Sequence, residues 1–240
     1  LSHRNILANI KQISEMLNIT DEEVFLGSLP SFNSFGFTVT TMLPILEGIK
    51  LAFHPDPTDA FGIGKVVAKN RVTFICSSSN LLNLYLENTK LTPLMFESLK
   101  MVFVGFDGAD KSLGDKFFKT FGVRIYEGYG MRECCSVISS NIPDNLDMNY
   151  WQIQIGTKKQ TVGMPLCGCV VRIVDTANMK EVAPNEAGQI LVSGSNVMVG
   201  YLNDIEKTNE VFVLLDGQLW YKTGDVGHID EDGFLTIIKS

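Results

Sequence analysis

The residues with the clearest chemical potential form the stretch Gly128-Tyr129-Gly130-Met131-Arg132-Glu133, which follows an apolar run. Two glycines remove Cβ on both sides of Tyr129, so the main chain could approach a flat or anionic ligand while the ring offers a stacking surface. Glu133 adds a hard oxygen ligand, suited to a magnesium ion that already carries substrate phosphates. The same spacing is expected where glycines end a strand and Tyr129 is core, so the stretch alone leaves both interpretations open.

An aromatic-rich turn at 31–36 is a second place where a ligand could bind, because it follows a strand candidate at 24–30. Phe32 and Phe35 beside a strand end are a usual wall for an apolar ligand pocket. Phenylalanines are also typical of the hydrophobic core, so this pattern leaves both interpretations open as well.

The chain up to Tyr129 alternates between helix-like and strand-like patterns. Helices are expected at 2–17, 38–47, 62–70, 81–86 and 111–121, and strands at 24–30, 49–53, 72–76, 101–110 and in the run before Gly128. This alternation predicts parallel strands joined by crossover helices, and hence an open α/β sheet. Ligands of such sheets bind at the carboxyl ends of strands, so the strand ending at Asp110 and the strand ending before Gly128 are expected to be neighbours at one crevice.

The crossover helix at 111–121 should turn one apolar face to the sheet. Its spacing predicts Leu113, Phe117 and Phe118 on that face. Gly122 is expected to end the helix, because glycine readily adopts the left-handed conformation found at helix C-termini.

The pattern changes after Thr161, where short apolar runs follow one another at short intervals. Asp216-Gly217 and Asp232-Gly233 each stand between two such runs, and Asp-Gly is the strongest short-range signal for a β-hairpin. We therefore expect a boundary near residue 165. Residues 1–165 would form an α/β region, and residues 166–240 a small β-barrel-like or twisted antiparallel subdomain.

The composition argues against several classes of protein. The formal charge is −7 and the 20 basic residues are spread along the chain, which argues against a nucleic-acid partner. Five cysteines without paired Cys-x-x-Cys spacing indicate free thiols in a reducing compartment. Because no uncharged apolar run approaches the roughly 18 residues of a membrane span, the chain is expected to be soluble and cytoplasmic.

Four stretches, in order along the chain, resemble motifs of the adenylate-forming enzymes, the superfamily of acyl-CoA synthetases, luciferases and peptide-synthetase adenylation domains. Residues 30–36 resemble Pro-x-Phe-His-x-x-Gly, and residues 108–110 resemble Gly-Gly-Ala/Gly-Ala-Glu. Residues 128–133 resemble the Tyr-Gly-x-Thr-Glu motif, and residues 221–225 resemble Tyr-x-Thr-Gly-Asp. The family fold implied by this resemblance, a truncated N-terminal domain, matches the α/β sheet and small β-subdomain expected above.

The resemblance also implies roles for individual residues. Binding of ATP or AMP is implied for Gly108, Ala109, Asp110, Gly128, Tyr129, Gly130 and Asp225. Asp225 would accept hydrogen bonds from the ribose hydroxyls, a task that suits the two oxygens of a carboxylate. Glu133 would bind Mg²⁺ and, with Arg132, act at the reacting phosphate. Substrate binding is implied for Phe32, Asn33, Phe35 and Gly36, which match a family segment whose aromatic residue gates the acyl and nucleotide sites.

Two positions depart from the family pattern. Asn33 stands where His is usual, and an amide can hydrogen-bond but cannot titrate. Arg132 stands where Thr normally contacts phosphate and acyl oxygens. We expect Arg132 to replace the threonine in phosphate contact, because a guanidinium binds phosphate directly; the alternative is that it competes with magnesium for Glu133.

The implied reaction joins a fatty acid, expected to be long-chain, to the α-phosphate of ATP, and passes the acyl group to the thiol of CoA or of acyl carrier protein. Residues 29–36 and 134–143 most resemble the bacterial acyl-ACP synthetase/2-acylglycerophosphoethanolamine acyltransferase group, which sits at the membrane. The abrupt chain ends suggest a central fragment. The resemblance would then place the phosphate-binding loop upstream, the catalytic lysine downstream, and any membrane contact outside these residues.

Two alternatives stay open at this point. A degenerate, non-catalytic nucleotide- or partner-binding domain of the same fold would account for Asn33 and Arg132 at motif positions. An unrelated α/β nucleotide-binding protein would leave the hairpin-rich C-terminal region and the order of the motifs unexplained.

Overall fold

The computed structural model describes residues 1–105 and 112–239 of the 240-residue chain. The chain forms two compact units. We call Leu17–Gly128 the α/β unit, and Leu1–Met16 with Tyr129–Ser240 the β-rich unit. The boundary expected near residue 165 divides the chain by type of secondary structure rather than by contacts, and it stays a prediction.

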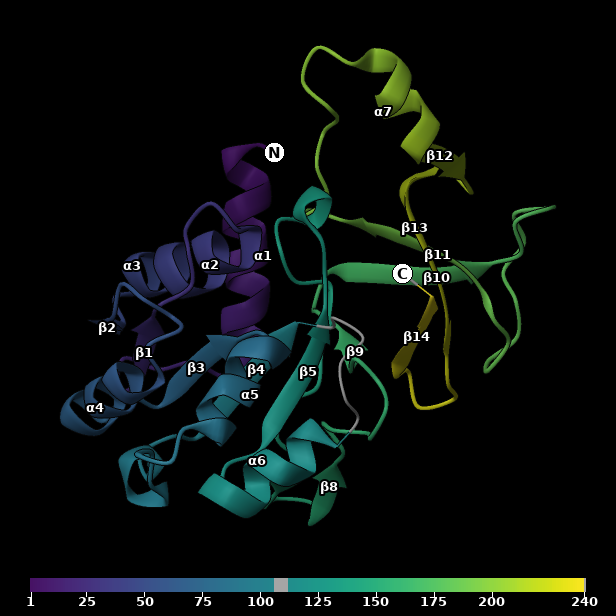
Figure 1. Ribbon diagram of the computed structural model, residues 1–240. Helices are drawn as coiled ribbons and strands as arrows, with labels where there is room; N and C mark the ends of the chain where they lie inside the picture. The colour runs from purple at the N-terminus through teal and green to yellow at the C-terminus, as the bar shows by residue number, and fades with distance from the viewer. Residues whose placement is uncertain (106–111, 240) are drawn as a thin grey trace. The chain divides into compact units, whose positions relative to one another are not determined.

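In the described part of the α/β unit, parallel strands are ordered β2-β1-β3-β4-β5 (Figure 1). The strands are β1 Val24–Gly27, β2 Lys50–Phe53, β3 Phe74–Ser77, β4 Met101–Gly105 and β5 Ile125–Tyr129. The helical segments are α2 Ser34–Phe37, a π-helical turn Thr38–Met42, α3 Leu43–Glu47, α4 Ala60–Asn70, α5 Ser79–Glu87, a 3-10 turn Pro93–Phe96 and α6 Leu113–Phe121. The predicted open, mostly parallel α/β sheet is confirmed.

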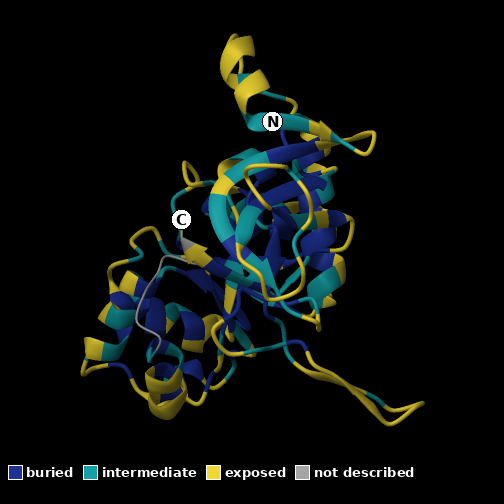
Figure 2. Ribbon diagram, turned by 90° about the vertical axis from the view of Figure 1, so that its right-hand side faces the viewer, coloured by how far each residue is buried: buried dark blue, intermediate teal, exposed yellow. Residues whose placement is uncertain are grey.

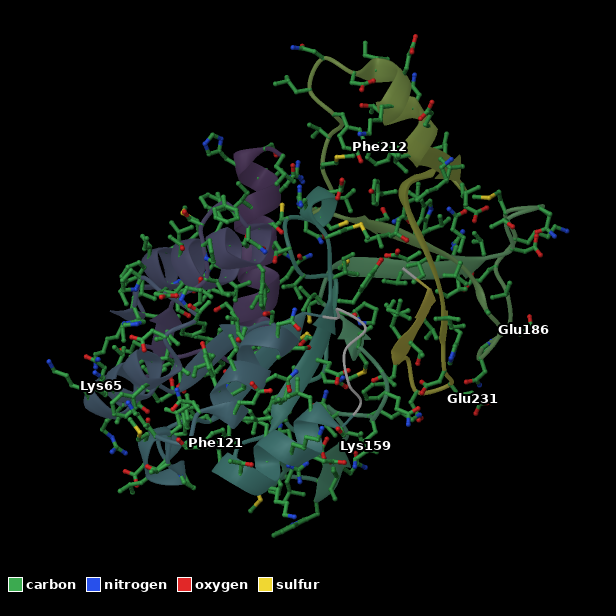
Figure 3. The ribbon with its side chains drawn as sticks, in the orientation of Figure 1. Lys65, Phe121, Lys159, Glu186, Phe212 and Glu231 are labelled. Carbon is green, nitrogen blue, oxygen red and sulfur yellow. The ribbon has the colours of Figure 1, made fainter. Side chains whose placement is uncertain are left out.

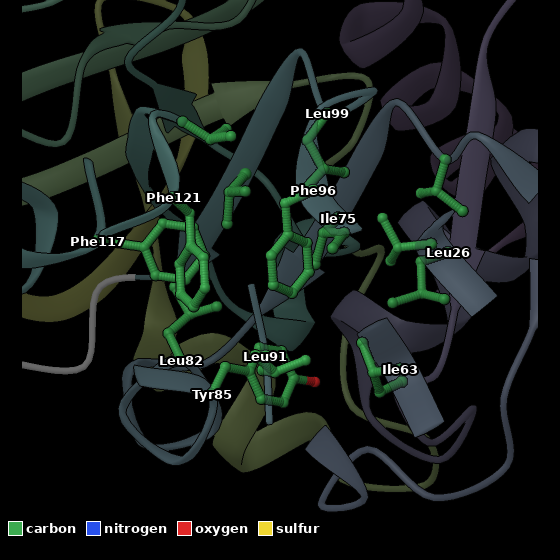
Figure 4. Close-up of a cluster of buried hydrophobic side chains, with 14 of the residues drawn as sticks. Leu26, Ile63, Ile75, Leu82, Tyr85, Leu91, Phe96, Leu99, Phe117 and Phe121 are labelled. Carbon is green, nitrogen blue, oxygen red and sulfur yellow. The ribbon is translucent and has the colours of Figure 1, made fainter. Parts of the chain in front are cut away.

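Both faces of this sheet are apolar, because successive side chains of a strand point to opposite faces and parallel sheets are usually covered on both. On one face Phe25 stacks on Phe74 with ring centroids 4.8 Å apart, Phe74 lies 6.0 Å from Phe103, and Phe103 lies 5.7 Å from Tyr126. The residues on the other face pack with helices α4, α5 and α6 in one cluster that includes Leu26, Ile63, Ile75, Leu82, Tyr85, Phe96, Phe117 and Phe121 (Figure 4).

Helix α6 differs from its expected orientation at one residue. Leu113 and Phe117 are buried as expected, but Phe118 is 48% exposed and Phe121 is buried in its place. Positions 113, 117 and 121 share a face because they are four residues apart, and position 118 lies about 100° further round the helix than 117. The Phe118 ring contacts the Arg124 guanidinium instead, 5.7 Å from its centroid. The expectation was therefore wrong for Phe118.

The helix expected at 38–47 begins earlier, at Ser34, and widens into a π-helical turn at Thr38–Met42. The hydroxyls of Thr40 and Thr41 both donate to the Gly36 carbonyl oxygen, at 2.9 and 3.0 Å. Such side-chain bonds offer a backbone carbonyl a partner other than the regular helical N–H. The other expected helices and strands are present, and the ends that fall within the described residues are shifted by a few positions, the usual uncertainty of sequence patterns.

The β-rich unit contains an antiparallel sheet in the order β10-β11-β13-β12, with β14 paired to β13. Its strands are β10 Cys169–Val174, β11 Gly188–Gly194, β12 Phe212–Leu215, β13 Gln218–Ile229 and β14 Leu235–Lys239. The other elements are α1 His3–Leu17, a 3-10 turn Arg132–Cys134, the pair β6 Ser139–Ser140 and β9 Met164–Pro165, the hairpin β7 Asn145–Asp147 and β8 Gln152–Gln154, and α7 Ile205–Val211. Asp216-Gly217 joins β12 to β13, and Asp232-Gly233 lies between β13 and β14, so both predicted turns are confirmed.

Trp220 of β13 lies in the core of the β-rich unit. It is 1% exposed and packs with Val174 and Leu191, and the guanidinium of Arg172 lies 4.7 Å from its ring centroid. On the next residue of β13, the Tyr221 ring meets Phe212 of β12 edge-on, with ring centroids 5.8 Å apart. Phe212 is labelled in Figure 3. Strand β13 is thereby fixed by large side chains just before residues 223–225.

The hairpin β7–β8 carries its apolar residues on one exposed face. Leu146 lies opposite Ile153, and the flanking cross-strand pairs are polar. Because side chains alternate along a strand, the apolar ones gather on one side. The exposed apolar residues of the hairpin are Leu146, Met148, Trp151, Ile153 and Ile155. Figure 2 shows the whole chain coloured by burial. Trp151 is 72% exposed.

Two features bear on the environment expected for the chain. All five cysteines are free thiols, as expected, and Cys167 alone among them is exposed. Burial raises the pKa of the Cys76 thiol to about 12, so it stays protonated. Among the described residues, no helix combines the length and the apolar character needed to cross a bilayer.

Candidate functional site

The chain leaves β5 at Tyr129 and turns at Gly130. A Cβ atom at Gly130 would collide with the backbone carbonyl of Ser136 and lie 2.9 Å from the Cα of Val137. The Ile138 N–H donates to the Tyr129 carbonyl oxygen at 2.8 Å and closes the loop onto the strand end. The close approach that Gly130 permits here is therefore to the protein's own loop.

The Tyr129 side chain reaches Asp225 of β13. Tyr129 is 5% exposed, and its hydroxyl donates to the Asp225 Oδ2 atom. Burial raises the pKa of Tyr129 well above its ordinary value, and the hydrogen bond to the Asp225 carboxylate raises it further. The phenol therefore remains a donor at neutral pH and fixes one carboxylate oxygen, while no hydrogen bond to Oδ1 occurs within the described residues.

A bulge in β13 presents Asp225. Lys222 pairs with Leu191 and Val226 with Gln189, so three residues of β13, 223–225, stand opposite the single residue 190 of β11. The Asp225 N–H donates to Thr223 Oγ1 at 3.1 Å, and that hydroxyl donates to the carbonyl oxygen of residue 190 at 2.9 Å. Bulges commonly re-aim a side chain next to a functional site. Here the bulge directs the carboxylate toward Tyr129.

Glu133 lies in the 3-10 turn Arg132–Cys134 and is held at two points. Its carboxylate Oε1 accepts a hydrogen bond from the Tyr201 hydroxyl at 3.0 Å, and its backbone oxygen accepts one from the Met198 N–H at 2.7 Å. Sequence reasoning gave residues 199–202 no chemical role, so it missed Tyr201. No local spacing signals this contact, because 68 positions separate the two side chains.

A third side chain extends this contact. Tyr221 of β13 lies next to Tyr201, whose hydroxyl donates to Glu133. Burial raises the pKa of Tyr201, with Glu133 acting in the same direction, and burial is also the main cause of the raised pKa of Tyr221. Both phenols stay protonated at neutral pH, so the Tyr201 hydroxyl remains a donor to Glu133.

Arg132 is exposed, and its guanidinium makes no hydrogen bond or ion pair with any residue in the described ranges. The carboxylate of Glu133 contacts Tyr201 and not Arg132. The guanidinium is therefore available to an anion.

The two cysteines after Glu133 are structural. Burial raises the pKa of Cys135 to about 11, and it raises that of Cys134 well above its ordinary value. Thiols that stay protonated are weak nucleophiles. Cys135 has φ of 68°, a left-handed conformation that is unfavourable for a residue with a side chain, and strain of this kind is concentrated at functional sites.

The remaining candidate residues are described within the α/β unit. Phe32 is 92% exposed and is therefore not a core residue. The Asn33 side-chain oxygen accepts from the Phe35 N–H at 2.9 Å and caps α2, and Phe35 is half-buried. A Cβ at Gly36 would collide with the backbone carbonyl of Pro30. This segment is therefore a tight turn with one phenylalanine displayed on the surface.

Strands β4 and β5 are neighbours as expected, with Gly105 paired to Gly128, while the expected strand end at Asp110 lies outside the described residues. Gly108, Ala109 and Asp110, the remaining expected nucleotide-binding residues, lie outside the described residues.

At Glu133 a magnesium ion would be coordinated by one protein carboxylate and not by several protein ligands. Within the described residues no group of three or more His, Cys, Asp and Glu side chains could hold a metal ion. Magnesium is commonly bound by one or two carboxylates together with water and substrate phosphates. Glu133, with Oε1 held by Tyr201, fits that mode of binding.

Sequence comparison gives the first line of external evidence. The sequence model of the family described as AMP-binding enzyme matches residues 1–202. A long-chain-fatty-acid–CoA ligase from Salmonella typhimurium is 32% identical over 241 residues, covering 99% of this chain. The chain spans 40% of the length of that curated relative.

Comparison with solved structures gives the second line of external evidence. MatB from Rhodopseudomonas palustris, in its apo form, superposes with a TM-score of 0.86 at 25% identity, over 100% of this chain and 44% of that one. O-succinylbenzoate coenzyme A synthetase from Bacillus subtilis, in complex with ATP and magnesium ion, superposes with a TM-score of 0.82 at 26% identity, over 99% of this chain and 46% of that one. Both likenesses extend over essentially all of this chain.

Proposed function

This chain belongs to the AMP-binding enzyme family, and we propose that it forms the nucleotide-binding part of an ATP-dependent acid:CoA ligase that activates a long-chain fatty acid. The ligase relative at 32% identity supports the reaction class. One observation carries the proposal: the hydrogen bond between Tyr129 and Asp225 brings together residues of two separate motifs that the resemblance assigns to one nucleotide.

In the proposed site Asp225 accepts hydrogen bonds from the ribose hydroxyls. A carboxylate oxygen can accept two hydrogen bonds. The bond from Tyr129 therefore leaves Oδ2 able to accept one more, and Oδ1 keeps both of its acceptor positions. The adenine lies against Tyr129 and the main chain at Gly128 and Gly130. The resemblance assigns residues 108–110 to the same pocket.

The chemistry then needs positioning and charge neutralisation. A carboxylate oxygen of the fatty acid attacks the α-phosphorus of ATP and the bond to pyrophosphate breaks, giving acyl-AMP; a thiol next attacks the acyl carbon and AMP leaves. Magnesium, when bound, neutralises phosphate charge. Glu133 holds that ion and Arg132 contacts the phosphate, so the residues of this chain bind and orient. No protein nucleophile is needed, which agrees with the protonated Cys134 and Cys135 thiols.

The acyl side of the site is assigned to Phe32, Asn33, Phe35 and Gly36. The Phe32 ring is exposed, and its assignment to the acyl side rests on the resemblance. The thiol acceptor is CoA, in line with the ligase relative. Acyl carrier protein is the alternative acceptor, supported only by the likeness of residues 29–36 and 134–143 to acyl-ACP synthetases.

A second candidate function is a non-catalytic nucleotide- or partner-binding domain of the same fold. Two observations favour it: Arg132 occupies the threonine position, and the Asn33 amide is used to cap α2. Pyrophosphate exchange by the intact protein separates the two candidates, because only the ligase catalyses fatty-acid-dependent exchange.

Calorimetric titration with AMP tests the proposed site directly. The intact protein should bind AMP, and Asp225→Ala should weaken binding by about tenfold or more, since hydrogen bonds to a charged group each contribute about 1.5–3 kcal/mol. Glu210→Ala, which removes an exposed carboxylate of α7, is the matched control and should bind like wild type. Absence of AMP binding in wild type, or equal binding by Asp225→Ala, would overturn the proposal.

A further inference from the structure

We propose that Tyr201 is a positioning residue for Glu133: its hydroxyl holds one carboxylate oxygen so that the group can receive the magnesium ion of bound ATP. This inference rests on the proposed function. The bond from the Tyr201 hydroxyl to Glu133 Oε1 is 3.0 Å long, and no hydrogen bond to Oε2 occurs among the residues that the structure describes. One oxygen is therefore fixed and the other is available as a hard ligand.

The segment from Met198 to Tyr201 holds Glu133 twice. The Met198 N–H donates to the Glu133 backbone oxygen at 2.7 Å, and three residues later the Tyr201 hydroxyl reaches the carboxylate. A carboxylate on a surface turn would otherwise sample several rotamers, and fixing one side chain in advance removes part of the entropy cost of binding. The two contacts together define both the position of the turn and the direction of its side chain.

The Tyr201 ring is itself held in place by α7. The Tyr201 N–H donates to Thr208 Oγ1 at 2.9 Å, and the ammonium of Lys207 lies 4.5 Å from the ring centroid. A Cβ at Gly200, whose φ is 148°, would lie 2.8 Å from Thr208 Cγ2, so glycine permits this close approach. Asp204 accepts from the Lys207 N–H at 2.9 Å and caps the helix. These contacts position the ring without using its hydroxyl.

The hydroxyl can therefore be removed with little effect on the surroundings. Tyr201→Phe keeps the ring, its contact with Lys207 and the backbone bond to Thr208, and it removes the hydroxyl that donates to Glu133. Tyr150→Phe removes an exposed tyrosine hydroxyl from the β7–β8 hairpin and is the matched control.

Calorimetric titration of the intact protein with ATP, at a series of Mg²⁺ concentrations, measures the Mg²⁺ concentration that half-saturates ATP binding. Tyr201→Phe should raise this concentration about tenfold, the size expected for losing a hydrogen bond to a charged group. AMP binding without metal and the melting temperature should match wild type. Tyr150→Phe should match wild type throughout. In a Glu133→Gln background, Tyr201→Phe should have no further effect on the Mg²⁺ requirement, because the two residues act as one unit.

The outcomes separate this inference from the function on which it rests. An unchanged Mg²⁺ requirement in Tyr201→Phe would overturn the inference, and so would a lower one, which would mean that the tyrosine competes with the ion. Equal weakening of AMP and Mg·ATP binding would identify a merely structural role. A wild-type protein that binds neither nucleotide would overturn the proposed function, and the inference with it.

Discussion

The Tyr129 hydroxyl donates to the carboxylate of Asp225 although 96 positions separate the two residues in the chain. Tyr129→Phe keeps the stacking ring and removes only this bond, so it should weaken AMP binding about tenfold by releasing Asp225 from its fixed orientation. Calorimetry with AMP measures the change. In an Asp225→Ala background the same substitution should have no further effect. Additive losses would show that the two residues act independently.

Arg132 has no partner among the described residues, and its exposed guanidinium is proposed to contact the nucleotide phosphate. Arg132→Thr, which introduces the residue usual in the family, should therefore weaken AMP binding about tenfold. Arg4→Thr removes another exposed arginine of the β-rich unit and should leave the affinity unchanged. Unchanged or tighter binding by Arg132→Thr would contradict phosphate contact.

Substitution by alanine is expected to change the free energy of unfolding in opposite directions at Gly130 and Gly114. Gly130→Ala places Cβ against the Ser136 carbonyl and should destabilise the protein by about 1–3 kcal/mol. Gly114→Ala adds a methyl group within α6, where no described atom lies within 4 Å, and should stabilise by about 0.4–1 kcal/mol. Urea unfolding measures both free energies. Equal effects of the two substitutions would contradict the close packing at Gly130.

Lys158 joins two turns of the β-rich unit, and its contribution to stability should depend on pH. Its Nζ atom lies 2.5 Å from Asp230 Oδ2 and 2.9 Å from Asp232 Oδ2, and these bonds raise the pKa of Lys158. Burial alone would raise the pKa of Asp230, but hydrogen bonds from Lys158 and from the backbone N–H of Phe234 outweigh it, so that pKa is lowered.

A carboxylate whose pKa is lowered by folding stabilises the folded state above its ordinary value of 3.8 and loses that contribution as the pH falls through the lowered pKa. A lysine whose pKa is raised stabilises below its ordinary value of 10.5 and loses it as the pH rises through the raised pKa. Lys158→Met should thus be less stable than wild type at pH 7 in urea unfolding, and the difference should shrink below 3.8. A difference that does not vary with pH would contradict the ion pairs; Lys119→Met is the control at an exposed lysine.

Much of the fold could be predicted because its signals are local. Strands buried on both faces appear as continuous apolar runs, such as residues 101–105, and the two Asp-Gly turns fix hairpins through the backbone conformations those residues permit. Asp216 and Gly217 do have positive φ, of 52° and 77°. Phe118 was misassigned although the four-residue spacing of Leu113, Phe117 and Phe121 already places position 118 on a different side of the helix.

The candidate site could be predicted only in part. Chemical motifs singled out Tyr129, Glu133 and Asp225, since their residue types suit a nucleotide. The structure adds their partners: the bond between Tyr129 and Asp225 and the contact of Tyr201 with Glu133 both join segments distant in sequence. Such contacts depend on how β13 and the segment before α7 are placed, and no residue pattern within either segment encodes this.

One of the two tryptophans of the chain is buried and the other is exposed, so their fluorescence emissions can be distinguished. Trp220 is 1% exposed and directly precedes Tyr221, which interacts with Tyr201. Trp151 is 72% exposed on the β7–β8 hairpin. A water-soluble quencher such as iodide should suppress the red-shifted emission of Trp151 and spare the blue-shifted emission of Trp220. The quenched spectrum then isolates an emitter close in sequence to Asp225, the residue proposed to bind the ribose, and with Trp151→Phe the intrinsic fluorescence becomes a single-site reporter that needs no attached dye.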